Sequence, residues 1–88
     1  MKFYVDDKNY ISYYNEISNN KLTAIYHYKS KNSYVQFFKN GMYHNPKNAD
    51  YINNKGFKDF SLNNKFYGYD KDFTKQSWRR FVKMKVFL

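Results

Sequence analysis

The sequence predicts an α+β protein, a mainly antiparallel, twisted β-meander of hairpins followed by a C-terminal amphipathic helix. Three observations predict this class. Phe, Tyr and Trp make up 24% of the 88 residues, and aromatic residues favour strands over helices. Turn-forming Asn and Gly residues punctuate the middle of the chain at short intervals. Beyond Asp72 the apolar residues adopt helical spacing. A chain of this length is expected to form a single domain over residues 1–88.

The first third of the chain contains two predicted strands and one ambiguous stretch. Residues 3–5 predict a short strand, and residues 22–28 predict a longer one whose side chains alternate between two faces. Between them, the tyrosines and the isoleucine of residues 10–17 fall at helical spacing, while the β-rich composition argues for a strand, so both structures stay open. Residues 18–21 and 29–32 are polar and predict turns.

The middle of the chain predicts a first hairpin. Residues 34–39 form one strand, and Asn40-Gly41 forms the turn, because both residues tolerate positive φ. Residues 42–44 begin the return strand. The segment Asn45-Pro46-Lys47-Asn48 breaks that strand, and residues 49–52 predict another short one.

A second hairpin follows. Residues 53–56 predict a turn, residues 57–62 a strand, and Asn63-Asn64 a two-residue turn. Residues 65–67 form the return strand, and residues 68–72 are expected to be loop.

The C-terminal segment predicts the only clear helix. Thr74 is expected to act as its N-cap, and Asp72 to help cap it and complement its dipole. One apolar stripe at i, i+3 and i+4, expected to pack on the sheet, is formed by Trp78, Phe81 and Val82. Residues 84–88 either extend the helix or form a last strand.

The two hairpins repeat one pattern. A shift that places Tyr34 on Phe57 also aligns two further aromatic pairs and both turns. These aligned pairs are Phe37 with Phe60, Asn40 with Asn63, Gly41 with Asn64, and Tyr43 with Phe66. Because a single hairpin is marginally stable, neighbouring units are expected to bury a shared aromatic face.

This pattern resembles a known repeat. The segment from Phe37 to Tyr51, with its Asn40-Gly41 turn and His44, resembles the MORN-like hairpin repeat of small phage and bacterial proteins. The segment from Phe60 to Tyr67 resembles a second copy, and Phe73 to Trp78 resembles the helix start with a Trp that often follows such repeats.

The resemblance covers about residues 22–83, and the chain departs from the pattern at three positions. Asn48, Asn64 and Tyr67 stand where Pro, Gly and His are usual. The resemblance implies a twisted meander of hairpins, an origin in a mobile element such as a phage, and no catalytic role.

The charge of the chain is strongly positive and uneven. The formal net charge is +9. Residues 45–88 carry ten Lys or Arg against four acids, and no acid follows Asp72. A field of this sign attracts polyanions, with a strong dependence on salt. The charge therefore favours an anionic partner over a role in solubility alone.

Several classes of function are disfavoured by the sequence. The chain has no Cys, which excludes disulfides and Cys-based zinc sites. His27 and His44 lie apart without a metal-binding spacing, and we expect structural roles, with His44 bonded to turn backbone. No carboxylate pair, nucleophile elbow or phosphate loop is present, so neither an enzyme nor a bound cofactor is expected. With no signal segment or membrane-spanning run, the expected compartment is the host cytoplasm, and no membrane partner is expected.

The helix supplies the first candidate binding residues. Arg79 and Arg80 are the only arginines, and they adjoin the single Trp. Arg presents a planar fork to phosphate or carboxylate, and we expect Arg79, Arg80, Lys83 and Lys75 to bind a partner. The alternative is that Trp78 anchors the helix while these charges only face water.

Aromatic residues of the predicted strand 34–39 supply the second candidate site. Tyr34 and Phe38 share one face of that strand, and an exposed aromatic face can stack on bases or bind a protein. The alternative, burial in a dimer or under loops, stays open.

Three functions follow as hypotheses. The first is a small basic phage or mobile-element protein that engages a host protein or nucleoprotein complex of the anti-CRISPR or anti-defence type by steric or electrostatic occlusion. The second is direct, weakly sequence-specific binding of single-stranded nucleic acid. The third is a structural β protein that forms homo-oligomers. The oligomeric state itself is left open.

Overall fold

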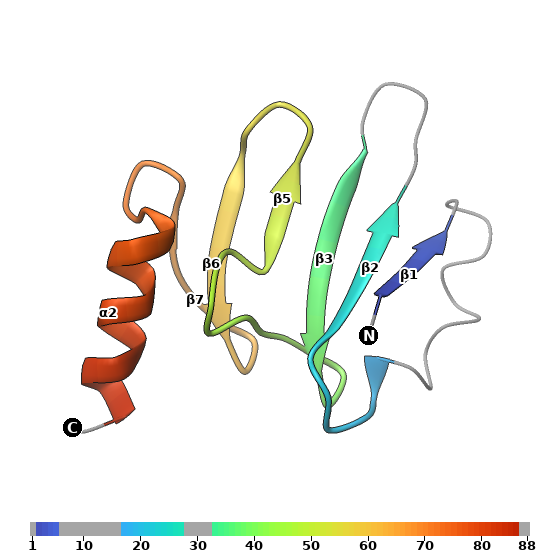
Figure 1. The fold of residues 1–88 in the computed structure, drawn as a ribbon, viewed down its shortest axis with the longest axis horizontal. Coiled ribbons are helices and arrows are strands. Elements are labelled where there is room, and N and C mark those ends of the chain that lie inside the picture. The colour runs from blue at the N-terminus through green and yellow to red at the C-terminus, as the bar shows by residue number, and fades with distance from the viewer. Residues whose placement is uncertain (1, 6–16, 28–32, 87–88) are drawn as a thin grey trace.

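The computed structural model describes residues 2–5, 17–27 and 33–86, and the predicted α+β architecture is confirmed (Figure 1). One seven-stranded sheet has the order β1-β2-β3-β5-β6-β7, with β4 pairing with β3. All strand pairs are antiparallel except β1 with β2. The strands are β1 (Lys2–Val5), β2 (Thr23–His27), β3 (Tyr34–Lys39), β4 (Met42–Tyr43), β5 (Tyr51–Asn53), β6 (Lys58–Leu62) and β7 (Lys65–Tyr69).

Both predicted hairpin turns are confirmed. Asn40 and Gly41 join β3 to β4 with φ of 55° and 74°. Asn63 and Asn64 join β6 to β7 with φ of 50° and 66°. Asn tolerates this left-handed region because its short polar side chain can bond locally. The two turns therefore place the aligned segments in equivalent hairpins.

The expected loop over residues 68–72 is wrong in its first two residues. β7 continues through Gly68 and Tyr69, which pair with Phe60 and Asp59. A register shift between Phe60 and Ser61 allows this extension. A Cβ on Gly68 would lie 2.9 Å from Asp72 Cβ and from the Phe73 ring, so only Gly fits where the chain folds back. The ambiguous residues 10–16 and the predicted turn 29–32 lie outside the described residues.

The predicted helix is α2 (Lys75–Val86), so residues 84–86 extend the helix, and residues 87–88 lie outside the described part of the chain. Thr74 Oγ1 accepts a hydrogen bond from the Ser77 backbone N–H at 3.0 Å, as expected of an N-cap. The capping role expected of Asp72 is wrong. Its carboxylate accepts from the Tyr69 N–H at 2.9 Å, because the turn after β7 points the side chain back to the strand.

The core lies between α2 and one face of the sheet. Ala49, Phe60 and Trp78 are fully buried, as predicted for Trp78. Partly buried side chains surround them: Ile52, Leu62, Tyr67, Phe73, Phe81 and Val82. The Trp78 indole N–H donates to the Asn45 carbonyl at 2.8 Å, which fastens the helix to the segment between β4 and β5.

The helix covers only one end of the sheet. Figure 1 shows α2 beside β6 and β7, with β1, β2 and β3 extending away from it. We call the side of the sheet that bears α2 the helix face and the other side the far face. Ile52 and Phe60 lie on the helix face because they pack around Trp78. Four residues lie opposite one another on neighbouring strands and therefore share the far face: Gln36, Tyr51, Asp59 and Tyr69.

Candidate nucleic-acid interface

Three cations form a row along one flank of α2. Lys75, Arg79 and Lys83 are spaced four residues apart and all are exposed. Four residues advance an α-helix by about 6 Å and return to nearly the same side. Since Trp78 points into the core, the row lies beside the buried stripe. The structure thus places three of the four predicted helix cations in one row.

A loop residue extends this row. The Arg79 Nε–H donates to the Lys47 carbonyl at 2.8 Å, which holds the guanidinium beside an exposed Lys47. Arg79, Lys47 and Lys83 line a shallow pocket of about 350 Å³ together with Pro46 and Val82. We call Lys47, Lys75, Arg79 and Lys83 the basic flank. Lys47 was missed because its position depends on how residues 45–49 pack under Trp78.

Arg80 does not belong to the same row. Successive helical residues are rotated by about 100°, so Arg80 faces the side nearly opposite Trp78 while Arg79 lies beside the sheet. Both are exposed. Adjacency in the sequence therefore does not make the two arginines one site.

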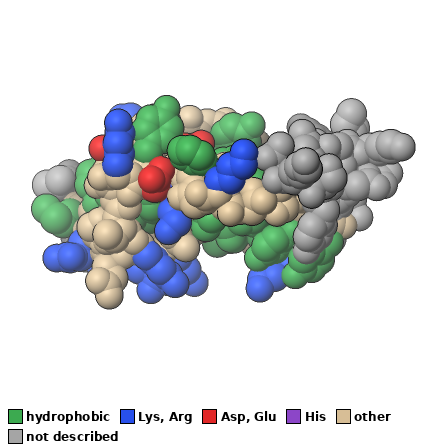
Figure 2. Space-filling model, turned by 90° about the horizontal axis from the view of Figure 1, so that it is seen from above, with side chains coloured by type: hydrophobic (Ala, Val, Ile, Leu, Met, Phe, Trp, Pro, Cys, Tyr) green, Lys and Arg blue, Asp and Glu red, His purple; other side chains and the backbone are tan. Residues whose placement is uncertain are grey.

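No carboxylate neutralises the basic flank in the part of the chain that the structure describes. The helix contains no acid, and no ion pair joins its cations to a carboxylate among these residues. Figure 2 shows several Lys and Arg side chains along the lower edge at the helix-bearing end, whereas the visible Asp and Glu side chains lie farther up, with other Lys or Arg side chains near them. Among the described residues the charge of the basic flank is therefore not offset by a paired carboxylate.

Two further lysines are held by a ring. The ammonium groups of Lys85 and Lys65 lie 5.0 Å and 5.4 Å from the centroid of the Tyr67 ring. Contacts of this kind are attractive because the face of an aromatic ring is electronegative. The ammonium groups of Lys65 and Lys85 are thus both held near the Tyr67 ring.

The two aromatic candidates differ from the expectation. Phe38 is only 2% exposed, so the exposed ring expected there is wrong. The centroid of its ring lies 5.4 Å from the centroid of the Tyr43 ring. Tyr34 is half-buried and stacks on His27 with the ring centroids 4.3 Å apart. Phe38 therefore offers no open stacking platform, whereas part of the Tyr34 side chain stays exposed.

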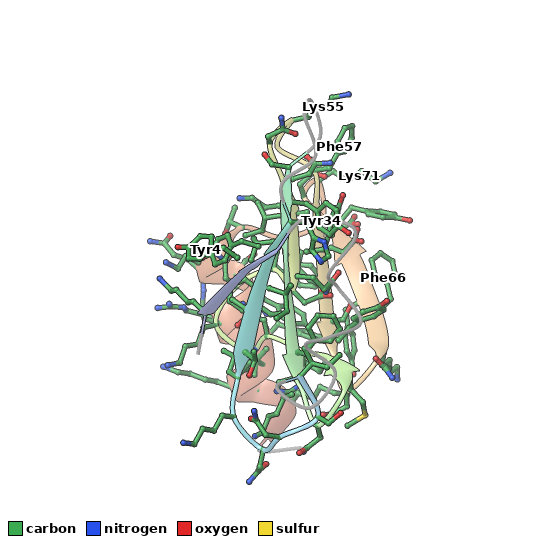
Figure 3. All side chains as sticks on the ribbon, turned by 90° about the vertical axis from the view of Figure 1, so that its right-hand side faces the viewer. Tyr4, Tyr34, Lys55, Phe57, Phe66 and Lys71 are labelled. Carbon is green, nitrogen blue, oxygen red and sulfur yellow. The ribbon has the colours of Figure 1, made fainter. Side chains whose placement is uncertain are left out.

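Exposed rings lie instead on the far face. Tyr43, Phe66 and Tyr69 are each about half exposed, at 49%, 48% and 50%. Figure 3 shows that Phe66 points away from the side that bears α2. The structure separates the basic flank on the helix side from these rings on the far face.

The histidines have structural environments. His44 Nδ1 accepts from the Asn63 backbone N–H at 3.1 Å, so it bonds to turn backbone as expected, but to the second turn. Burial lowers the pKa of His44, and the charge of Lys39 adds to this. His27 is 3% exposed beneath Tyr34. Among the described residues no group of His, Cys, Asp and Glu could hold a metal ion.

Two carboxylates that sequence reasoning passed over lie on neighbouring strands. Asp50 is 2% exposed, and its Oδ2 accepts from Gln36 Nε2 at 2.8 Å. Burial raises the pKa of Asp50 despite that hydrogen bond, and the charge of Asp59 raises it further. Burial also raises the pKa of Asp59, with a contribution from Asp70. Because Asp50 is enclosed, this pair does not present two carboxylates to a substrate.

Comparison with protein-family models, with curated proteins and with solved structures finds no match for this chain. The helix found in the described residues is too short and too polar to cross a membrane.

Proposed function

We propose that this chain is a small binding protein that engages a nucleic-acid-handling complex, with the basic flank contacting the phosphate backbone of nucleic acid in that complex. The observation that carries the proposal is the row of exposed cations at Lys75, Arg79 and Lys83, with Lys47 beside it and no carboxylate paired to it among the described residues. Such a row can follow a line of phosphates.

The far face supports a protein component in the target. Tyr43, Phe66 and Tyr69 expose apolar ring surface on the side away from the basic flank. Contiguous exposed apolar surface marks protein-binding sites. A thin molecule, 17 Å along its shortest axis, with these two surfaces on opposite sides, suits occlusion between nucleic acid and protein. A phage or mobile-element protein that blocks a host defence complex in the cytoplasm is the setting we propose.

The second candidate is direct binding of single-stranded nucleic acid without a protein partner. The net charge of +9 favours it, because sequence-independent affinity comes mainly from phosphate contacts. Fluorescence anisotropy with a labelled oligonucleotide at two salt concentrations distinguishes the candidates. An oligonucleotide left unbound at micromolar protein eliminates direct binding, whereas capture of a complex that is lost on nuclease treatment supports the first candidate.

The basic flank is tested by replacing Lys75, Arg79 and Lys83 together with Ala. We expect affinity for the nucleic acid or its complex to fall by on the order of tenfold or more. Each phosphate contact contributes about 0.7 to the salt slope on a single strand, so the slope should fall by about 2. The measurement is the binding constant as a function of salt concentration.

A charge-matched control separates the flank from the overall field. Lys21, Lys65 and Lys71 are exposed and lie outside α2. Replacing these three with Ala removes the same charge, and we expect a much smaller loss. Equal losses in the two triple variants would contradict a localised site and leave only non-specific attraction.

A further inference from the structure

A pocket of about 340 Å³ opens on the far face, at the end of the sheet where β5 turns into β6. Ligand pockets start at about this size and combine rings with a few polar groups. Figure 3 shows Tyr34, Lys55 and Phe57 at this end of the sheet. The described residues that line it are Ser33, Tyr34, Tyr51, Asn53, Asn54, Lys55 and Phe57.

The floor of the pocket is built from rings that the sheet holds in place. Tyr34 stacks on the buried His27 with ring centroids 4.3 Å apart. The Tyr51 ring lies 5.3 Å from that of Tyr34, tilted by 39°. Tyr34 pairs with Asn53 and Gln36 pairs with Tyr51, so both tyrosines point to the far face. A planar ligand would meet a preformed aromatic surface here.

The wall of the pocket is a turn that presents Phe57 and Lys55. Asn53 Oδ1 accepts from the backbone N–H groups of both Lys55 and Phe57, at 2.9 Å and 3.0 Å. Gly56 at the apex has φ of 90°. The Asn54 N–H donates to the Ser33 carbonyl at 3.0 Å, which ties the turn to the start of β3. The turn is therefore fixed although Phe57 is 60% exposed.

The charge at the pocket indicates which kind of planar ligand would fit there. Lys55 is exposed at the edge, and none of the described residues that line the pocket is a carboxylate. An uncharged aromatic side chain would make no use of the ammonium group. An inorganic phosphate would make no use of the three rings. A planar base that carries a phosphate uses both features, because bases stack on aromatic rings and phosphates attract Lys.

We propose that this pocket binds one nucleotide, with its base against Phe57, Tyr34 and Tyr51 and its phosphate at Lys55. The nucleotide is either a free monophosphate or an unpaired residue of a single strand. The proposal goes beyond the proposed function, because the pocket lies on the far face and the basic flank lies on the helix side. Either site can exist without the other.

The test is an NMR titration of the ¹⁵N-labelled full chain with AMP, UMP, adenosine and ribose 5-phosphate. Binding of AMP or UMP should shift the backbone amides of Asn54, Lys55 and Phe57, and ribose 5-phosphate should bind more weakly because it cannot stack. The absence of shifts at millimolar AMP and UMP overturns the proposal. Ribose 5-phosphate binding as tightly as AMP also overturns it.

Two variants with matched controls assign the contacts. Phe57→Ala should weaken AMP binding by on the order of tenfold, as expected for loss of one stacked ring. Lys55→Ala should weaken the binding of AMP but not of adenosine. Phe66→Ala and Lys71→Ala remove an exposed ring and an exposed lysine outside the pocket lining, and should leave AMP binding unchanged (Figure 3). Unchanged AMP binding in Phe57→Ala, with a native-like spectrum, overturns the proposal.

Two further arms separate the sources and the sites. A 5′-phosphorylated oligothymidine that displaces AMP identifies the single strand as a source, whereas failure to compete, with AMP still bound, identifies the free nucleotide. The variant that replaces Lys75, Arg79 and Lys83 with Ala should still bind AMP. Loss of AMP binding in that variant would assign the nucleotide to the basic flank and overturn the proposal.

Discussion

Asn45 joins three parts of the fold. It is 2% exposed. Its Nδ2 donates to the Ala49 carbonyl at 3.0 Å, its Oδ1 accepts from the Lys47 N–H at 3.0 Å, and its carbonyl accepts from the Trp78 indole at 2.8 Å. This residue therefore shapes the loop that brings Lys47 to Arg79.

Asn45→Ala should lower the free energy of unfolding by about 1–3 kcal/mol, because two hydrogen bonds of its side chain are lost in a buried place. The measurement is the urea midpoint at unchanged m-value. Asn48→Ala is the matched control. Its Oδ1 is buried and has no hydrogen-bond partner in the described part of the chain, so its loss should cost less. A greater loss in Asn48→Ala would contradict this account.

Asp50 gives the stability a pH dependence of known sign. Burial raises its folded-state pKa above the unfolded value of 3.8. The stability that it contributes is fully present below the unfolded pKa and is lost as pH rises through the folded pKa. Ionisation at neutral pH therefore opposes folding.

Asp50→Asn should raise the urea midpoint at pH 7, since an amide oxygen can still accept from Gln36 without a buried charge. The difference from the parent protein should shrink as pH approaches the unfolded value of 3.8. Urea denaturation of both proteins across this range measures it. A variant that is less stable than the parent protein at pH 7 would show that hydrogen bonds to the Asp50 carboxylate offset the cost of burying its charge.

At the scale of the element, the start of α2 is a reciprocal cap. Ser77 N–H donates to Thr74 Oγ1 at 3.0 Å, and the Thr74 N–H donates to Ser77 Oγ at 2.8 Å. Thr74→Ala should lower the free energy of unfolding by about 1 kcal/mol. Thr74→Ser keeps the acceptor oxygen and should recover most of the loss. Thermal unfolding followed by circular dichroism measures both, and equal losses would exclude the hydrogen bond as the cause.

The hairpins and the helix could be predicted from local sequence, because each depends on turn residues or on a helical stripe within a few residues. The parallel pairing of β1 with β2 could not, since it joins segments far apart in the chain. The strand at Gly68 was also missed. A glycine there indicates a turn locally, whereas its actual cause is the close approach of Asp72 and Phe73.

In the candidate site, too, some features follow from local sequence and others depend on tertiary contacts. The spacing of Lys75, Arg79 and Lys83 is a property of one helix, and it was predictable. The contribution of Lys47 depends on contacts made around Trp78 and Asn45, and it was not. Alternation placed Tyr34 and Phe38 on one face correctly, but it could not tell that Phe38 is buried while Phe57 and Phe66 are exposed.

At the scale of the whole molecule, hydrogen bonds join the return strand of the first hairpin to the turn of the second hairpin. The Tyr43 N–H donates to Asn64 Oδ1 at 2.7 Å, and the Asn64 N–H donates to the Tyr43 carbonyl at 2.9 Å. His44 Nδ1 accepts a hydrogen bond from the backbone N–H of Asn63, the other residue of the same turn. The return strand of the first hairpin therefore holds the turn of the second.

The second hairpin has a different side chain at the position that corresponds to His44. Tyr67 stands where the first hairpin has His44, and its ring packs on Trp78 and Phe81, at 5.8 Å and 5.3 Å between centroids. The helix α2 thus covers the end of the series of hairpins. A longer protein of this type could arise by duplication of a whole hairpin before the second one. The histidine of each new hairpin would then accept a hydrogen bond from the turn of the hairpin that follows.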